Sequence, residues 1–117
     1  MKRRVHLISF KHAWEGLRYA FTSQPNFVVH LSFAILVILA GCYFGITQTE
    51  SIILLFSISL VITAELLNTA IESMTDILII EYSKHAKIAK DVAAGMVLFS
   101  ALSAVVVGTI IFLPYVL

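Results

Sequence analysis

The sequence lacks the residue patterns that mark several common classes of small soluble domain. It has one cysteine, Cys42, which rules out an intrachain disulfide, and its five glycines are scattered rather than gathered in a phosphate-cradling loop. Cysteine and histidine do not cluster at the spacing of zinc ligands. The net charge is +1, so the chain has no general attraction to nucleic acid. These absences exclude a disulfide scaffold, a zinc module, a nucleic-acid-binding domain and the common glycine-rich nucleotide loop.

Charged residues are also scarce, and their absence from long stretches is typical of a membrane protein. They make up 13% of the chain, against about 25% in soluble domains, while 60% of the residues are hydrophobic. A membrane-spanning helix needs about 20 mostly apolar residues. We expect three such spans, at about residues 26–46, 51–80 and 91–115. The sequence therefore predicts an all-α integral membrane protein with a single domain over residues 1–117.

The positions of the basic residues predict how the spans are oriented. All eight lysines and arginines lie in the first eighteen residues or between residues 84 and 90, and none lies between residues 19 and 83. Basic segments beside membrane spans remain in the cytoplasm. We therefore expect a multi-pass protein of the plasma membrane with its N-terminus in the cytoplasm and its C-terminus outside.

The segment before the first span, at about residues 9–22, has the pattern of an amphipathic helix. Apolar residues recur at helical spacing along one stripe, and charged residues lie on or beside the other face. This pattern suits a helix that lies in the membrane interface, with Trp14 at the depth of the headgroups. The alternative is a helix that packs on the protein's own connector.

Polar residues interrupt the second span along one face of the helix. Glu65, Asn68, Glu72 and Asp76 fall within an arc of about 80° at 100° per residue, and we call them the polar ladder. If this span begins near residue 51, Glu65 lies about 20 Å into a hydrocarbon core of about 30 Å. Glu72 then lies near the inner edge of the core and Asp76 beyond it. A carboxylate at the depth of Glu65 costs at least a few kcal/mol unless it is paired or protonated, and such residues usually mark a functional site.

Charged residues at the start of the third span complete a set suited to phosphoryl transfer. That reaction uses Mg²⁺ held by carboxylates, cations on the transferred group and a residue that positions the attacking oxygen. Lys90 can neutralise a phosphate, and Asp91 can hold a lysine or assist a metal. Glu65 lies at a depth that a lipid hydroxyl can reach. The structural alternative is that Glu65 and Glu72 pair with Lys90 or Arg18.

Two other functions are compatible with a carboxylate ladder in a membrane helix. A small oligomeric channel or proton-coupled carrier can use such a ladder as an ion pathway. A membrane subunit without catalytic activity is the second. The region from residue 52 to residue 64 contains no charged residue, which disfavours a pathway through the whole membrane.

The ladder is part of a longer pattern. Residues 65–72 read ELLNTAIE, Asp76 follows, and residues 89–98 read AKDVAAGMVL. This pattern resembles the signature of the small prokaryotic diacylglycerol kinase family, and the likeness extends to WEGL at residues 14–17 and QPNFVVH at residues 24–30. The resemblance implies an interfacial helix plus three transmembrane helices, assembled as a homotrimer with active sites between subunits. It also implies a kinase that uses ATP and Mg²⁺ on a membrane lipid.

The resemblance assigns roles to particular residues. Glu65 corresponds to the general base on the lipid hydroxyl, Glu72 to the carboxylate that binds the Mg²⁺ of the nucleotide, and Asn68 to a residue that orders the site. Lys90 and Asp91 correspond to positions that contact the nucleotide. The resemblance also places Glu81, Tyr82 and Ser83, in the segment that connects the second and third spans, beside them in the nucleotide site.

One residue departs from the family pattern. Gln24 stands where the best-known members carry a second metal-binding glutamate, and its carbonyl can ligate Mg²⁺ only without a charge. The runs at residues 26–30 and 89–95 are more similar to the undecaprenol kinase branch than to the diacylglycerol-specific one. The resemblance thus implies phosphorylation of undecaprenol or diacylglycerol at the cytoplasmic membrane face.

Overall fold

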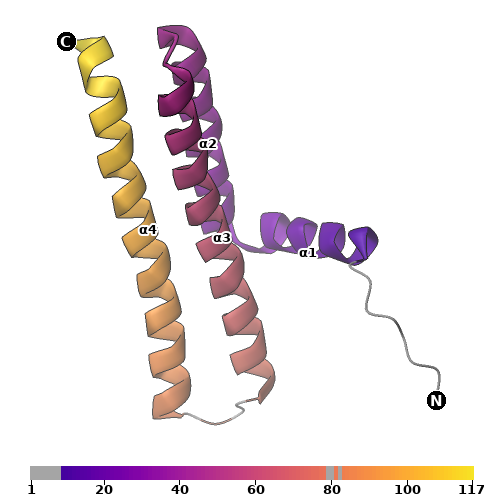
Figure 1. Cartoon of the computed structure of the whole chain (residues 1–117). Helices are drawn as coiled ribbons and strands as arrows, with labels where there is room; N and C mark the ends of the chain where they lie inside the picture. Colours follow the sequence, from indigo (N-terminus) through magenta and orange to yellow (C-terminus); the bar gives the residue numbers. More distant parts are fainter. Residues whose placement is uncertain (1–8, 79–80, 82) are drawn as a thin grey trace.

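The protein is a bundle of three long helices with a shorter helix running crosswise (Figure 1). The computed structural model describes residues 9–78, 81 and 83–117. Within them the chain forms four helices and no strand: α1 (Phe10–Ser23), α2 (Pro25–Phe44), α3 (Gln48–Leu78) and α4 (Lys84–Val116). The last three are long and apolar enough to cross a membrane. The prediction of an all-α membrane protein with three spanning helices is thereby confirmed.

The short helix α1 begins at a cap and ends where the chain changes direction. The Ser9 hydroxyl accepts a hydrogen bond from the His12 amide at 3.4 Å, which caps the first turn. At the other end Gln24 adopts an extended conformation, and Pro25 occupies the first turn of α2, where it needs no hydrogen-bond donor. The apolar side chains of Phe10 and Trp14 are 87% and 66% exposed, so α1 keeps an uncovered apolar stripe.

The turn between α2 and α3 depends on glycine. Gly45 has a φ of 64°, in the left-handed region that favours glycine. The amides of Gly45 and Ile46 both donate to the Gly41 carbonyl, at 3.0 and 3.2 Å. A Cβ atom at Gly41 would lie 3.0 Å from the Ile46 side chain, so the turn packs closely. This tight reversal brings α3 back alongside α2.

Polar and aromatic contacts tie the three long helices together at this turn end of the bundle. Thr47 and Glu50 form a capping box, in which the amide of each donates to the side chain of the other. The Glu50 carboxylate also accepts a hydrogen bond of 2.5 Å from the Tyr115 hydroxyl, near the end of α4. The Phe44 ring packs against the rings of Phe112 and Tyr115, with centroids 6.1 Å apart in each pair.

The other end of the bundle, where α3 is connected to α4, is more helical than the sequence indicates. α4 begins at Lys84, before the start near residue 91 that we expected for the third span. The Ser83 hydroxyl accepts from the Ala86 amide and caps this extension. The extension places Lys90 on a rigid helix directly opposite the end of α3.

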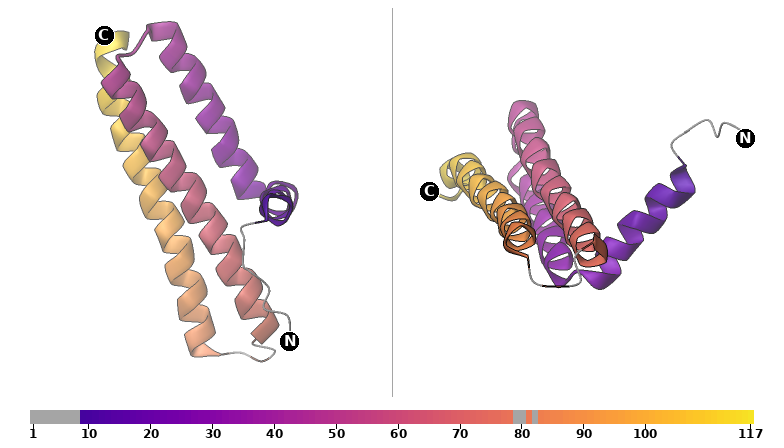
Figure 2. Two further views of the ribbon diagram at one scale, coloured as in Figure 1. Left: turned by 45° about the vertical axis from the view of Figure 1, so that its right-hand side comes forward. Right: turned by 90° about the horizontal axis from the view of Figure 1, so that it is seen from below.

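The three long helices pack unevenly, as two views of the bundle illustrate (Figure 2). α3 lies along α4 over much of its length, whereas α2 contacts α3 and barely meets α4. Large apolar side chains on all three helices are exposed, as expected for helices whose solvent is lipid. The polar ladder lies on α3, the helix shared by both packed pairs.

Candidate active site

The polar ladder occupies the half of α3 nearest the α3–α4 connector. Glu65 is 2% exposed and Asn68 9%, whereas Asp76 near the end of the helix is exposed. Glu72 lies between them and is half-buried. Burial therefore increases along the ladder away from the connector, in the order that the sequence spacing predicts.

Two buried atoms of the ladder lack hydrogen-bond partners in the described part of the chain. They are Oε2 of Glu65 and Oδ1 of Asn68. Leaving a buried polar group unsatisfied costs about 1–3 kcal/mol, and more when the group is charged. Proteins rarely tolerate that cost without a functional reason. Both atoms are acceptors, so a hydroxyl or another donor from a bound molecule would satisfy them.

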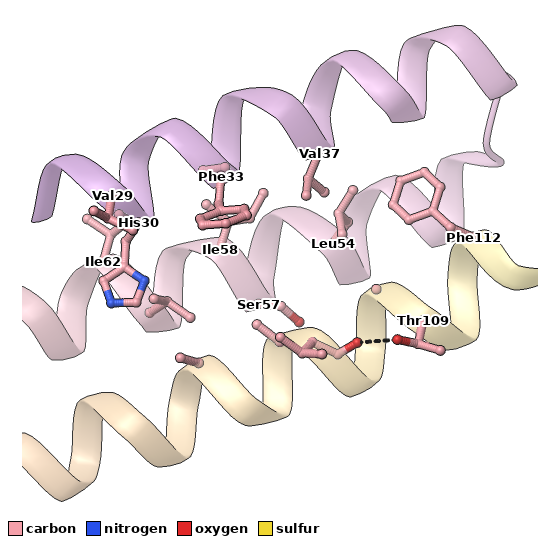
Figure 3. Close-up of a pocket in the computed structure, with 16 residues that line it drawn as sticks. Val29, His30, Phe33, Val37, Leu54, Ser57, Ile58, Ile62, Thr109 and Phe112 are labelled. Atoms are coloured by element: carbon pink, nitrogen blue, oxygen red, sulfur yellow. Dashed lines mark hydrogen bonds between the residues drawn. The ribbon is translucent and has the colours of Figure 1, made fainter. Parts of the chain in front are cut away.

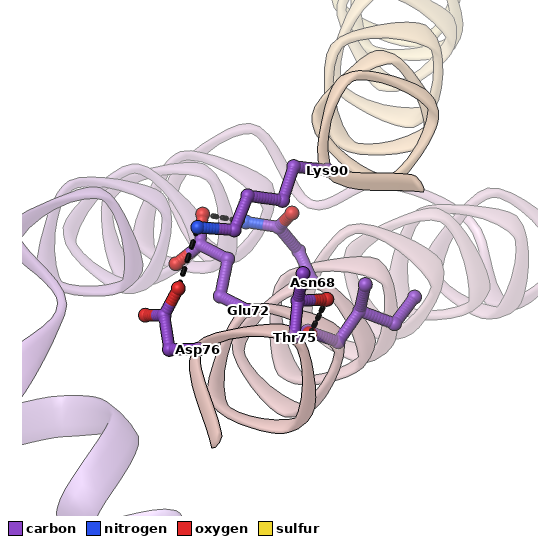
Figure 4. Close-up of polar contacts among 6 residues, drawn as sticks. Asn68, Glu72, Thr75, Asp76 and Lys90 are labelled. Carbon is purple, nitrogen blue, oxygen red and sulfur yellow. Dashed lines mark hydrogen bonds and ion pairs between the residues drawn. The ribbon is translucent and has the colours of Figure 1, made fainter. Parts of the chain in front are cut away.

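Asn68 holds the next carboxylate of the ladder in place. Its side-chain amide donates to Oε1 of Glu72 at 3.4 Å, one turn along the helix (Figure 4). The neighbouring threonines are occupied elsewhere: Thr69 and Thr75 donate to the backbone carbonyls of Glu65 and Ile71. Asn68 thus couples the buried part of the ladder to its accessible part.

Lys90 reaches across from α4 to the ladder. Its ammonium group lies 2.5 Å from Asp76 and close enough to Glu72 to interact with its charge (Figure 4). The Lys90 and Asp76 side chains are 42% and 65% exposed, and such surface ion pairs contribute little to stability. The pair therefore contributes mainly to the arrangement of the site. It places a cation beside two carboxylates at the accessible end of the ladder.

The remaining predicted site residues are more scattered. Asp91 pairs with Lys87 at 2.6 Å within α4, so it does hold a lysine, and this lysine is not the one that pairs with the ladder. Glu81 is exposed and Ser83 caps α4. Tyr82 lies outside the described residues. The alternative, a pairing of Glu65 and Glu72 with Lys90 or Arg18, is not formed among the described residues, where Lys90 pairs with Asp76.

Gln24 sits at the junction between α1 and α2. Its backbone amide donates to the Ala20 carbonyl at 3.1 Å, and its half-buried side chain makes no capping hydrogen bond. α1 packs against the part of α3 that carries the ladder, where Ala20 and Ser73 line the same hollow. The junction therefore lies in the same half of the molecule as the polar ladder, although among the described residues no hydrogen bond joins Gln24 to the ladder.

His30 is a polar residue of α2 that lies outside the ladder. The structure places it in the first half of α2, where it lines a hollow between the three long helices (Figure 3). Its sequence signal was weak: a single histidine near the start of an apolar span is more often a packing residue than a ligand.

The donor groups of the ladder fit a magnesium ion bound together with a nucleotide. The described residues contain no group of three or more acidic, histidine or cysteine side chains that would enclose a metal by themselves. Mg²⁺, however, is commonly held by one or two carboxylates, with phosphates and water completing its coordination. Glu72 and Asp76 would supply such carboxylates, and the nucleotide would supply the rest.

Comparison with known proteins identifies the family. The model of prokaryotic diacylglycerol kinase matches residues 11–112, which is most of the chain. The chain belongs to the prokaryotic diacylglycerol kinase family. The resemblance seen in the ELLNTAIE and AKDVAAGMVL runs is thereby confirmed, and the ladder, Lys90 and Asp91 all fall inside the matched region.

Similar proteins of this family differ in the acceptor that their names specify. A diacylglycerol kinase of Synechocystis is 43% identical over 109 residues, which cover 92% of this chain and 62% of that protein. The undecaprenol kinase of Bacillus subtilis is 36% identical over 91% of this chain and 86% of its own length. The diacylglycerol kinase of Escherichia coli K12 is 30% identical over 81% and 78%. The chain thus spans less than two thirds of the Synechocystis relative.

Proposed function

We propose that this protein is a lipid kinase that transfers the γ-phosphate of ATP, in a Mg²⁺-dependent reaction, to the hydroxyl of undecaprenol or diacylglycerol. Family membership supports the reaction class. The observation that carries the proposal is the buried Glu65 carboxylate, whose Oε2 has no partner in the described chain. An acceptor alcohol within the membrane can donate its hydroxyl hydrogen to that oxygen.

We assign roles in the reaction to Glu65, Asn68 and Glu72 of the ladder and to Lys90. Glu65 accepts the proton of the lipid hydroxyl as that oxygen attacks the γ-phosphorus, the bond to the β-phosphate oxygen breaks, and ADP leaves. Asn68 orients Glu72 through their hydrogen bond. A Mg²⁺ ion held by Glu72 would neutralise charge on the phosphates. Lys90 lies beside Glu72 and Asp76, where its ammonium group can contact the same phosphates.

The membrane topology that we propose for the protein follows from the positions of its basic residues. We place the N-terminus and the α3–α4 connector in the cytoplasm and the C-terminus outside, so that ATP reaches the accessible end of the ladder. We also propose that the protein is a homotrimer in the plasma membrane with active sites between subunits. The exposed apolar faces of the three long helices are compatible with such an assembly. Analytical ultracentrifugation in detergent would measure the number of subunits.

The experiment that tests the proposed function is the transfer of labelled phosphate. Purified protein in mixed micelles receives ATP labelled at the γ-phosphate, Mg²⁺ and either undecaprenol or diacylglycerol. Labelled lipid is expected, and the better acceptor identifies the branch of the family. No labelled lipid from either acceptor, with folded protein, would contradict the proposal. Ion flux in liposomes without nucleotide would instead support the channel or carrier.

The acceptor that we favour is undecaprenol. The sequence supports it through residues 26–30 and 89–95, which are similar to the undecaprenol kinase branch. The named relatives argue both ways, since a diacylglycerol kinase and an undecaprenol kinase are each more than 35% identical to this chain. The ratio of kcat/KM for the two acceptors in the transfer assay decides between them.

Gln24 provides a further prediction. Replacing Gln24 by Glu adds a negative charge at the α1–α2 junction, where the family pattern has a metal-binding carboxylate. We expect the Mg²⁺ concentration that gives half-maximal rate to fall by about tenfold, because Mg²⁺ affinity rises with the charge of its ligands. Titration of the kinase rate with Mg²⁺ measures this shift.

The control for this prediction is Asn26→Asp, which adds the same charge at an exposed position two residues away. A matching decrease in that variant would mean that the effect is a general attraction of cations. The proposed metal role of Gln24 would then be wrong.

A further inference from the structure

A row of lysines marks the beginning of α4. Lys84, Lys87 and Lys90 recur every three residues, so each lies about 4.5 Å from the next along the helix axis and about 60° around it. The first turn of α4 contains no acidic residue. The N-terminal end of a helix carries a partial positive charge, which makes it an unfavourable place for lysine. The row therefore gathers positive charge where the helix by itself disfavours it.

Membrane topology accounts for basic residues beside the α3–α4 connector, but it does not account for their partners. A positive charge at any nearby position would help to keep the connector in the cytoplasm. Two of the lysines nevertheless hold particular carboxylates. Lys90 pairs with Asp76 across the helices, and Lys87 pairs with Asp91 one turn along α4. The ammonium groups of these two lysines are thereby kept at defined positions beside the ladder.

The ion pair between Lys87 and Asp91 contributes little to stability. Nζ of Lys87 lies 2.6 Å from Oδ2 of Asp91, and the two side chains are 61% and 62% exposed. Exposed ion pairs are weak, and a lysine that precedes its acidic partner by four residues is the less favourable order on a helix. Lys87 can therefore exchange its carboxylate for a phosphate group with little loss of stability.

Lys87 extends the line of charges formed by the ladder and Lys90. α3 ends and α4 begins at the connector, so the two helices run antiparallel (Figure 1). Glu72 lies about 6 Å from Asp76 along α3, on the side of Glu65. Lys90 reaches Asp76 from α4, and Lys87 lies about 4.5 Å nearer the connector than Lys90. From the buried end outward, the order is thus the buried carboxylate, the two accessible carboxylates with Lys90, and then Lys87.

We propose that Lys87 is a further nucleotide-binding residue, whose ammonium group contacts the phosphates that remain on ADP after the transfer. This inference rests on the proposed kinase function, in which the γ-phosphate meets the acceptor hydroxyl beside Glu65. The rest of the nucleotide then extends toward the connector, past Lys90 to Lys87. An ammonium group is a compact charge with three donors, which suits phosphate oxygens.

The kinetic test separates KM from kcat. Lys87→Gln removes a contact that ATP, the transition state and ADP share, so KM for ATP and the inhibition constant of ADP should both rise about tenfold, with kcat within about twofold of the wild type. Lys87→Arg keeps the charge and should restore most of the affinity. An unchanged KM, or a loss confined to kcat, would overturn the inference.

The matched control is Lys84→Gln, which removes the same charge from the same row. Lys84 is the exposed first residue of α4, about 9 Å from Lys90 along the axis and about 120° around it. It contributes to the topology signal in the same way as Lys87. We expect this variant to keep the wild-type KM for ATP. An equal rise in both variants would indicate a general attraction of anions and would overturn the specific contact.

A second comparison determines whether Lys87 acts only through its partner. If Lys87 served only to neutralise Asp91, its replacement would have no further effect in protein that already carries Asp91→Asn. A direct contact with phosphate predicts the opposite. In the Asp91→Asn background, Lys87→Gln should still weaken ADP binding by about tenfold. No further change in that background would overturn the inference.

Binding measured without an acceptor keeps the inference separate from the kinase proposal. Titration calorimetry in micelles gives Kd for ADP with Mg²⁺ and for adenosine. We expect Lys87→Gln to weaken ADP about tenfold and to leave adenosine unchanged, because the contact is to phosphate. Equal affinity of the two proteins for ADP would overturn the inference. If ADP binding depends on Lys87 but the wild type phosphorylates neither lipid, the proposed function fails and the phosphate contact stands.

The phosphate of an anionic lipid is the other source of this ligand chemistry at a membrane surface. The ADP titration is therefore repeated in micelles with and without phosphatidylglycerol. We expect the effect of Lys87→Gln to be the same in both. A defect that appears only with phosphatidylglycerol would place a lipid phosphate at Lys87 and overturn the assignment to the nucleotide.

Discussion

Replacing Glu65 by Gln is expected to lower kcat for lipid phosphorylation by roughly 1,000-fold, because a general base contributes about 10²–10⁴ to the rate. The amide has nearly the same shape as the carboxylate but cannot accept the proton of the acceptor hydroxyl. Glu65 is 2% exposed, and its replacement removes a buried charge, so the free energy of unfolding should stay the same or increase. Phosphate transfer and thermal unfolding in the same micelles measure the two effects.

The control for Glu65 is another carboxylate on the same helix. Glu50→Gln weakens the capping box with Thr47 and the hydrogen bond from Tyr115 at the turn end. We expect it to lower the free energy of unfolding and to leave kcat within about a factor of two. A Glu65→Gln variant that retains wild-type turnover would eliminate Glu65 as the base.

Replacing Glu72 by Gln should produce a different defect. The change removes a charged oxygen ligand, so the Mg²⁺ concentration for half-maximal rate should rise by at least about tenfold, since ligand charge sets the affinity of such sites. The hydrogen bond that Asn68 donates to Glu72 can still form with the amide oxygen, which keeps the local geometry. Excess Mg²⁺ should therefore restore part of the rate, whereas it should not rescue Glu65→Gln.

The measurement for Glu72 is a Mg²⁺ titration at saturating ATP. Glu15→Gln serves as the control, because Glu15 is an exposed carboxylate on α1 that pairs only with His12 among the described residues. Its titration should coincide with that of the wild type. If Glu72→Gln has a wild-type Mg²⁺ requirement, Glu72 does not bind the metal.

The sequence predicted the spans and the ladder because both depend on simple regularities. A bilayer requires long uncharged runs, and the helical repeat alone places Glu65, Asn68, Glu72 and Asp76 on one face of α3. The structure retains that face and the increase in burial toward Glu65. The roles of these residues are predictions that the Glu65→Gln and Glu72→Gln variants test.

The sequence alone does not predict which side chains far apart along the chain come into contact. Lys90 had several acidic candidates, and its choice of Asp76 depends on how α4 packs against α3. The hydrogen bond between Glu50 and Tyr115 joins residues 65 positions apart, with no local signal. The sequence predicts the third span from about residue 91, where the uncharged run begins, so the charged turns from Lys84 to Lys90 fall outside that prediction, although Ser83 is a typical helix cap.

The burial of Glu65 also determines which concentration of the acceptor matters. Glu65 lies on a membrane-spanning helix and is almost fully covered, so an alcohol that meets it is dissolved among lipids rather than in water. The relevant quantity is then the mole fraction of the acceptor in the membrane. Diluting a vesicle suspension with buffer would leave that fraction unchanged, whereas adding inert lipid would lower it. The enzyme would in this way respond to the composition of the bilayer itself.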